Sequence, residues 1–258
     1  MLSLEQIRVF FETLSVAEFT AMFWKGLGNT VKIAVIGLII GIVIGTLLAI
    51  VKVAPKYKLS MRILDKIASV YVAIFRGTPM VVQLLVAYFL FLPFLLPGIM
   101  SMFNINPTEN SIDFAFYVGT VVFGMNSGAY VSEIMRGGLN SVDSGQMEAG
   151  RALGLSYSTT MFKIVIPQAI KNILPTLGNE FITLIKETSV LSFIAVCDLY
   201  TAVKQIAQPG YAYEAGYLFM ALIYIAIILF ITALIKVMEH FLNKSDSKYG
   251  VTKSAKKS

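Results

Sequence analysis

Two glutamates stand seven residues apart in a mostly apolar segment, at Glu180 and Glu187. Together with Thr176 and Thr183 they are spaced four, three and four residues apart, which places all four along one side of a helix. A carboxylate can receive the ammonium group or the cationic side chain of a solute, and a threonine hydroxyl can add a hydrogen bond. This spacing therefore predicts a binding stripe for a small cationic group.

A second polar stripe consists of Asn126, Tyr130 and Glu133, which are spaced four and three residues apart. Asn126 and Tyr130 are candidate hydrogen-bonding partners of the same solute. The alternative for the two glutamates of the first stripe is internal charge pairing, with Arg76 or with Lys186 of a partner chain. Arg76 itself can attract a carboxylate or pair with a glutamate of either stripe, and of these roles we favour the pairing.

The sequence lacks the residues that a disulfide, a metal site, a catalytic site or a nucleotide site would need. The sequence has one cysteine, Cys197, and one histidine, His240, so neither an internal disulfide nor a His/Cys metal cluster is expected. No nucleophile is paired with a base and no G-x-x-x-x-G-K-[ST] motif occurs, so we expect no enzyme and no metal, nucleotide or other cofactor bound by this chain. The basic residues lie between apolar segments, where they set membrane orientation and do not indicate nucleic-acid binding.

The elements that must position these residues are membrane helices. Of the 258 residues, 57% are hydrophobic and 14% are charged, and the mean hydropathy is +0.75, which is outside the range of ordinary soluble domains. Pro79 is expected to kink or end one of the helices. Segments long enough to cross the hydrocarbon core predict five spans, at residues 31–51, 80–96 with part of 67–75, 114–134, 173–196 and 217–237.

Basic residues alternate between the two sides of these spans. They follow the first and third spans and fill the end of the chain, whereas residues 97–113 contain no lysine or arginine. The positive-inside rule then predicts an all-α membrane protein with five transmembrane helices, the N-terminus outside and the C-terminus cytoplasmic, plus short cytoplasmic coupling helices. We expect three parts: an amphipathic interfacial helix (1–26), a transmembrane domain (27–243) and a lysine-rich cytoplasmic tail (244–258). The apolar face of the interfacial helix comprises Ile7, Phe10, Phe11 and Leu14.

Residues 143–167 lie in the longest cytoplasmic connector and predict two short helices at an angle. Asp143 followed by Gln146 is typical of a capping box at the start of the first helix, and Gly154 is expected to stop it. Ser156 is expected to cap the second helix, and Pro167 to end it. Spacing alone leaves two alternatives, a docking site for another chain or a plain connector with a glycine hinge.

The same loop resembles the EAA loop of permease subunits in bacterial ATP-binding-cassette importers. Its residues fit the pattern E-A-A, three residues, G, nine residues, I-x-L-P, with Gly150 in place of alanine and Ile166 in place of leucine. Three further stretches are similar to the polar-amino-acid permeases in particular: RGTPMVVQ at 76–83, GAYVSEIMRG at 128–137, and LGNEFI with KETS at 177–182 and 186–189.

The resemblance implies a permease subunit of the bacterial inner membrane that translocates a polar amino acid, with a lean toward basic ones, by alternating access. It implies a second permease subunit, cytoplasmic ATPase subunits that bind ATP and Mg²⁺, and an extracytoplasmic solute-binding protein. The residues expected in coupling to the ATPase are Glu148, Ala149, Gly150, Gly154, Ile164 and Pro167. Those expected near the solute are Glu180, Glu187, Thr183, Asn126 and Tyr130.

An ion-coupled secondary transporter of amino acids is the alternative function, because intramembrane carboxylates can also carry protons or sodium. The odd number of five spans and the docking loop argue against this alternative, and the charged stripes argue against a scaffolding protein. Copurification of an ATPase chain would separate these classes.

Overall fold

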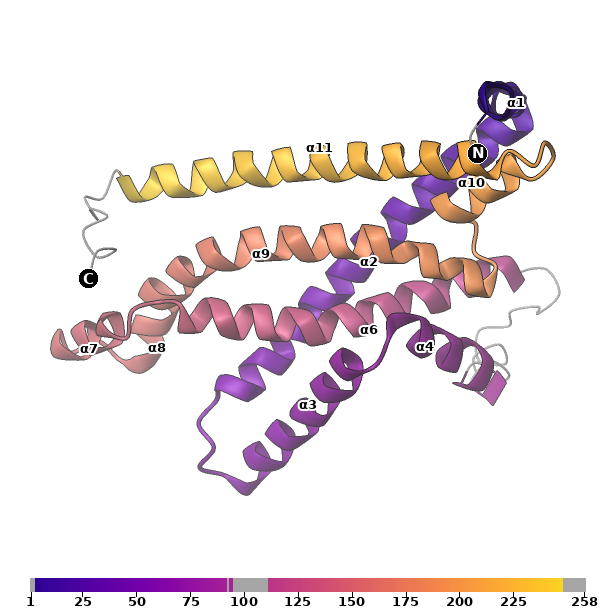
Figure 1. Ribbon diagram of the computed structural model, residues 1–258. Coiled ribbons are helices and arrows are strands. Elements are labelled where there is room, and N and C mark those ends of the chain that lie inside the picture. Colours follow the sequence, from indigo (N-terminus) through magenta and orange to yellow (C-terminus); the bar gives the residue numbers. More distant parts are fainter. Residues whose placement is uncertain (1–2, 92, 95–110, 248–258) are drawn as a thin grey trace.

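The computed structural model describes residues 3–91, 93–94 and 111–247, and these residues form helices without any strand (Figure 1). Three long helices, α6 (Ser111–Asn140), α9 (Ile166–Glu187) and α11 (Tyr213–Ser247), run side by side, and α2 (Ala17–Val53) crosses them obliquely. The short helices α7 (Gly145–Ala152) and α8 (Tyr157–Thr160) lie at the end of this bundle where α11 finishes. The helices α1 (Leu4–Ser15) and α10 (Leu199–Ala207) lie at the opposite end.

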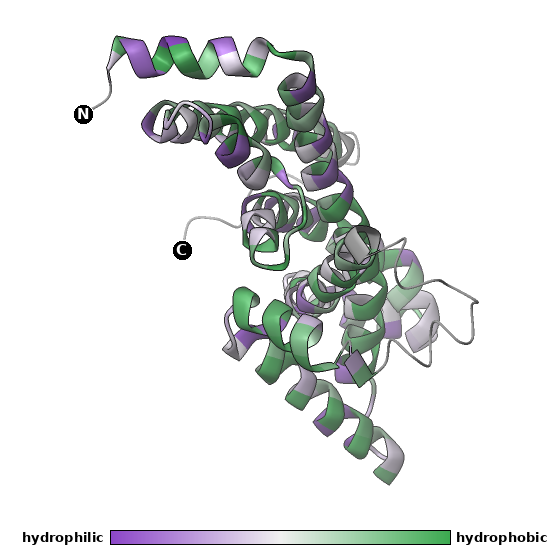
Figure 2. Cartoon of the chain, turned by 90° about the vertical axis from the view of Figure 1, so that its right-hand side faces the viewer, coloured by the Kyte–Doolittle hydropathy of each residue, from purple (hydrophilic) through white to green (hydrophobic). Residues whose placement is uncertain are grey.

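Three of the described helices are long and apolar enough to cross a membrane, namely α2, α6 and α11. A fourth candidate is a broken span in which α3 (Leu59–Gly77) meets α4 (Met80–Leu85) and the following π-helix η1 (Val86–Phe91) at an angle of 108°. The more polar α9 is not among these candidates, so the count of five spans stays a prediction. The all-helical membrane architecture is confirmed, and most helices carry predominantly hydrophobic residues in Figure 2.

Glycines four residues apart let α2 and α6 approach closely. A methyl group added to Gly41 would lie 2.6 Å from Ser127 Oγ, and one added to Gly45 would lie 2.8 Å from the backbone nitrogen of Ser132. The relation is mutual, because a methyl group on Gly124 of α6 would lie 2.5 Å from Ile40 of α2. The two helices therefore interlock, as closely spaced small residues in membrane helices allow.

The break between α3 and α4 follows from Pro79. Proline lacks a backbone N–H and disfavours the helical conformation of the residue before it, and Thr78 is accordingly extended, with φ −119° and ψ 145°. The side-chain amide of Gln83 satisfies two carbonyls at the break, because its Nε2 donates to Phe75 O at 2.8 Å and to Thr78 O at 3.0 Å. The expected break at Pro79 is confirmed, and two carbonyl groups beside the break accept hydrogen bonds from Gln83.

The helix expected at 173–196 has different limits. It begins earlier, at Ile166, and it changes at Thr188 into a 3₁₀ helix, η3 (Thr188–Ile194), that Ala195 closes in a left-handed conformation with φ 59°. The spans expected at 31–51, 114–134 and 217–237 lie within the longer helices α2, α6 and α11. The span expected at 80–96 is instead divided between α4 and η1, and its residues 92 and 95–96 lie outside the described residues. The expected boundary after residue 26 falls inside α2, which runs without interruption from Ala17.

The turn before α10 is tied to α2. Asp198 caps α10 by accepting hydrogen bonds from the backbone nitrogens of Thr201 at 2.9 Å and Tyr200 at 3.2 Å. The backbone nitrogen of Leu199, the first residue of α10, donates a hydrogen bond of 3.0 Å to Thr30 Oγ1 of α2. Burial raises the pKa of the Asp198 carboxyl, although these donors act in the opposite direction.

The first helix, α1, is amphipathic, as expected, and hydrophilic and hydrophobic residues alternate along it in Figure 2. Ser3 and Gln6 form a capping box at its start. Phe10 is buried against Phe219 of α11, whereas Leu4 and Phe11 remain exposed. Most of the expected tail, residues 248–258, lies outside the described residues, and α11 extends to Ser247.

Candidate functional site

Glu180 lies inside the subunit, between α9 and α6. The whole residue is only 9% exposed, and its carboxylate oxygen Oε1 accepts a hydrogen bond of 2.9 Å from the buried hydroxyl of Ser127. Ser127 in turn packs against Gly41 of α2. A carboxylate held in this way needs either a proton or a cation nearby, because an unpaired buried charge is costly.

The four residues of the first expected stripe differ in environment. Thr176 is exposed and Thr183 is partly buried, and each donates its hydroxyl hydrogen to a carbonyl one turn back on α9. Glu187 is partly buried at the end of the helix. The structure therefore does not leave a single open stripe that includes Glu180. The exposed polar face of α9 instead comprises Gln168, Asn172, Thr176, Asn179 and Lys186.

Asn126 is buried and is committed to the break between α3 and α4. Its Nδ2 donates to Gln83 Oε1 at 2.9 Å and to Phe75 O at 3.2 Å. Gln83 thus connects two stretches far apart in the sequence, a role that the expected site residues did not include. The signal for it was present, since Gln83 is a polar side chain in an apolar segment.

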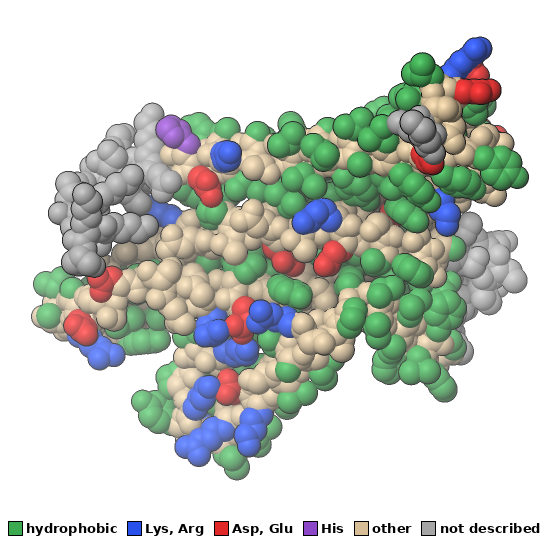
Figure 3. Space-filling view, in the orientation of Figure 1, with side chains coloured by type: hydrophobic (Ala, Val, Ile, Leu, Met, Phe, Trp, Pro, Cys, Tyr) green, Lys and Arg blue, Asp and Glu red, His purple; other side chains and the backbone are tan. Residues whose placement is uncertain are grey.

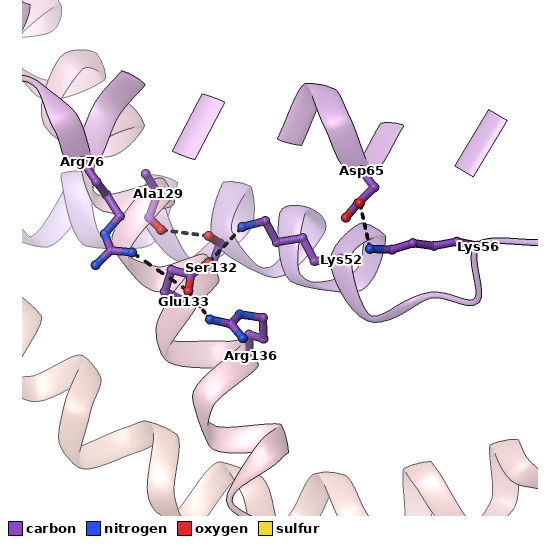
Figure 4. A network of polar contacts seen from close by, with 8 residues as sticks. All are labelled: Lys52, Lys56, Asp65, Arg76, Ala129, Ser132, Glu133 and Arg136. Atoms are coloured by element: carbon purple, nitrogen blue, oxygen red, sulfur yellow. Dashed lines mark hydrogen bonds and ion pairs between the residues drawn. The ribbon is translucent and has the colours of Figure 1, made fainter. Parts of the chain in front are cut away.

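Glu133 is the carboxylate shared by three cations (Figure 4). Lys52 Nζ lies 2.8 Å and Arg136 Nη2 2.5 Å from its oxygens, and Arg76 Nη1 lies 4.0 Å away. The expectation that Arg76 pairs with a glutamate is confirmed, and the glutamate is Glu133. Arg76 also lies over the ring of Tyr130, with its Cζ 5.4 Å from the ring centroid, which is within cation–π range.

A cavity of about 460 Å³ opens beside this network, within the size range of small-molecule sites. The second expected stripe thus has two environments: Tyr130 and Glu133 face the cavity, whereas Asn126 faces the helix break. The lining residues of the cavity include Arg76, Tyr130, Glu133, Ser141, Asn172 and Thr176. In Figure 3 lysines and arginines gather near the middle of this face and over α3 below it.

The connector at 143–167 folds into α7 and α8, but its first cap differs from the one expected. The N-cap is Ser144 rather than Asp143, and no side-chain capping bond forms there. Asp143 instead accepts a hydrogen bond of 2.7 Å from the backbone nitrogen of Gly145, which tightens the turn before the helix. The expected capping box is therefore wrong, because this local turn uses the Asp143 side chain.

Glycine ends α7, as expected: the helix finishes at Ala152, and Gly154 has φ +75°. The other glycine of the loop, Gly150, is buried against α8. A methyl group added to it would lie 2.5 Å from both Cγ2 and Oγ1 of Thr160. The departure from the E-A-A pattern thus has a steric reason. Glu148 and Ala149 are exposed beside it.

The second half of the loop continues into the bundle. Ser156 caps α8, as expected, by accepting a hydrogen bond of 3.2 Å from Thr159 N. Pro167 does not end this helix. A π-helical turn, η2 (Met161–Val165), links α8 directly to α9, and Pro167 is the second residue of α9. Ile164 is partly buried in η2, and helical structure runs from Tyr157 to Glu187.

Comparison with known proteins finds a match to the family model described as binding-protein-dependent transport system inner membrane component, over residues 37–244. The arginine transport system permease protein ArtQ of Bacillus subtilis is 37% identical, with 86% of this chain and 93% of that protein covered. The putative glutamine transport system permease protein GlnP of Rickettsia prowazekii is 40% identical, with 81% and 88% covered. Among solved structures, an amino acid ABC transporter matches with a TM-score of 0.72 and 36% identity, covering 88% of this chain and 97% of the matched chain.

Proposed function

Because the chain belongs to the family of binding-protein-dependent transport system inner membrane components, as an amino-acid permease subunit of the ATP-binding-cassette type, we propose that it translocates a polar amino acid by ATP-driven alternating access. It is an integral, multi-pass protein of the inner membrane. Basic amino acids and glutamine are the leading candidates for the solute, in view of the arginine and glutamine systems named for the two relatives.

The observation that carries this proposal is the exposed unit formed by α7 and α8 at one end of the bundle (Figure 1). Leu153, at the end of α7, is 78% exposed, and Tyr157 and Phe162 beside it are also exposed. A surface with several exposed apolar side chains is typical of a docking site. Helical structure then connects this unit to α9, so a displacement at α8 would be passed into the bundle.

We infer that the partner at this surface is a cytoplasmic ATPase subunit. The chain has no phosphate-binding loop motif of its own, so ATP and Mg²⁺ would be bound by that partner. Glu148 and Ala149 are exposed and available to it, whereas Gly150 and Gly154 shape the unit. Ile164 and Pro167 would act in the connection to α9.

The remaining partners follow from the same importer class: a second permease subunit and an extracytoplasmic solute-binding protein. The proposed topology has five spans, with α9 as the fourth, the N-terminus outside and the C-terminus inside. In this topology α1 lies in the outer interface and the lysine-rich tail in the cytoplasm. The buried Glu180 would receive a cationic group of the solute, helped by Thr183, Glu187, Asn126 and Tyr130.

Leu153→Asp tests the docking surface, with Leu4→Asp as a control that is 87% exposed at the opposite end of the bundle. Because both side chains are exposed, neither change should unfold the bundle. We expect Leu153→Asp to reduce copurification of the ATPase chain and solute-stimulated ATP hydrolysis at least tenfold, on the order of a buried interface contact, with the control unaffected. Solute transport without any ATPase chain would refute the proposed function and favour the ion-coupled alternative.

A further inference from the structure

The cluster around Glu133 carries more positive than negative charge. Lys52, Arg76 and Arg136 share this one carboxylate, which leaves an excess of two positive charges among the four side chains. Lys52 and Arg136 make the short contacts to Glu133, one hydrogen bond to each of its oxygens. Like charges held close together favour the approach of an anion, although exposure to water weakens their repulsion.

Arg76 is the cation of this cluster that is placed to receive that anion. Its distance of 4.0 Å from Glu133 is too long for a hydrogen bond, and over the residues that the structure describes its guanidinium makes no hydrogen bond at all. The side chain is 45% exposed. In Figure 4 one terminal nitrogen points toward Glu133 and the other points away from it.

The surroundings of Arg76 hold it in one orientation and leave room beside it. The ring of Tyr130 supports the guanidinium from one side. The cavity of about 460 Å³ opens next to both, and Asn172 and Thr176 of α9 line its other wall. Asn172 is itself fixed, because its Nδ2 donates to Ser141 Oγ at 2.8 Å. The Arg76 guanidinium and fixed polar groups therefore line a space that can accept a small ligand, together with the Glu133 carboxylate, whose charge Lys52 and Arg136 balance.

We propose that this cavity is a carboxylate-binding subsite in which Arg76 receives the α-carboxylate of the translocated amino acid. The inference rests on the proposed transport function and names a group that the expected solute site lacks. The planar guanidinium presents a pair of donors that matches the two oxygens of a carboxylate. Every amino acid carries this carboxylate, so the subsite contributes binding without selecting a side chain. The ion pair with Glu133 then serves to orient Arg76.

Matched variants separate this role from a purely structural one. Arg76→Gln removes the cation that lines the cavity, and Arg136→Gln removes a cation that pairs with the same Glu133 but does not line it. Arg76→Lys keeps the charge and loses the planar pair of donors. Each variant is purified as the complete complex of permease and ATPase subunits in lipid nanodiscs. Binding of L-arginine and L-glutamine is compared with that of their amides, L-argininamide and L-glutaminamide, which lack the carboxylate charge.

We expect the wild-type complex to bind its amino acid at least tenfold more tightly than the corresponding amide. Arg76→Gln should weaken amino-acid binding about tenfold to a hundredfold and leave amide binding nearly unchanged, in line with the loss of a charged hydrogen-bonding partner. Arg76→Lys should weaken amino-acid binding less than Arg76→Gln does. Arg136→Gln should lower thermal stability and keep the wild-type ratio between amino acid and amide.

Equal weakening of amino-acid and amide binding in Arg76→Gln would overturn the subsite and leave Arg76 a structural role. An effect of Arg76→Gln that disappears in nanodiscs without anionic lipid would assign the site to a lipid phosphate and would also overturn it. If the wild-type complex transports an amino acid while Arg76→Gln changes nothing, the subsite fails and the transport function stands. If the wild-type complex neither binds nor transports any amino acid, the proposed function fails as well.

Discussion

Replacing Gly150 with alanine should loosen the packing of α7 on α8, although alanine favours helices. In an open helix this change would stabilise by about 1 kcal/mol. Here the new methyl group meets Cγ2 and Oγ1 of Thr160, each at 2.5 Å, and Thr160 Cβ at 3.1 Å. Rotating the Thr160 side chain would not relieve the clash freely, because its hydroxyl donates to Ser156 O at 3.1 Å.

The size of the effect follows from three contributions. Overpacking of this kind costs about 1 to 3 kcal/mol, so Gly150→Ala alone should lose up to about 2 kcal/mol after the gain in helix propensity. Thr160→Ala alone should lower the stability of this packing by about 1 kcal/mol, because it removes the hydrogen bond of the Thr160 hydroxyl. The double variant removes both contacts of 2.5 Å, leaves only the Cβ at position 160 at 3.1 Å, and keeps the gain in propensity, so it should be near the wild type. The expected coupling energy between the two sites is therefore about 1 to 3 kcal/mol.

Hydrogen exchange of the α7 amides in the assembled complex measures this cycle directly, because local opening of the loop sets the exchange rate. A loss of about 1.4 kcal/mol corresponds to about tenfold faster exchange. Solute-stimulated ATP hydrolysis, measured in parallel, should fall in Gly150→Ala and recover in the double variant. Slower exchange in Gly150→Ala, or a coupling energy near zero, would refute the steric explanation of the glycine.

Two further predictions concern the helices that hold the site. Gly45→Ala places a methyl group 2.8 Å from the backbone nitrogen of Ser132, whereas Gly28→Ala on the same helix meets nothing within 4 Å. Gly45→Ala should therefore lower the free energy of unfolding by about 1 to 3 kcal/mol relative to Gly28→Ala. Thermal unfolding of the purified complex measures this difference. Equal stability of the two variants would contradict the close approach of α2 and α6. Asn126→Ala removes the donor to Gln83 and should lower the free energy of unfolding by about 1 to 3 kcal/mol in the same assay. Asn126→Asp restores the size of the side chain but not the donor, so it should not restore this stability. Full recovery of stability with aspartate would contradict the assigned hydrogen bonds.

Local signals in the sequence predicted local structure well. Gly154 and Ser156 mark the end of one helix and the start of the next through their own backbone and side-chain chemistry, and Pro79 breaks a helix by lacking an N–H. The glycines spaced four residues apart are a further local signal, typical of close helix packing, and Gly41 indeed lies against Ser127. Each of these signals depends on a few neighbouring residues.

Two of the features that sequence reasoning missed depend on distant partners. Spacing placed Glu180 on a helix face, but only the position of Ser127 on another helix decides that this face is buried. Asn126 was expected to serve a solute, but its amide donates to Phe75 O beside the distant break at Pro79 and to the side chain of Gln83. Pro167 was expected to end a helix, because the sequence does not reveal the π-helical turn that makes it the start of α9.

The interlocked contact of α2 and α6 limits how the subunit can change shape. Glycines at 37, 41 and 45 repeat every four residues, a rise of about 6 Å along the helix axis, so a small slide would drive side chains such as Ile40 and Val131 against the facing backbone. The two helices can therefore tilt together but cannot glide past each other gradually. Any opening of the subunit must then occur at its other joints, such as the extended pair of residues at Thr78 and Pro79.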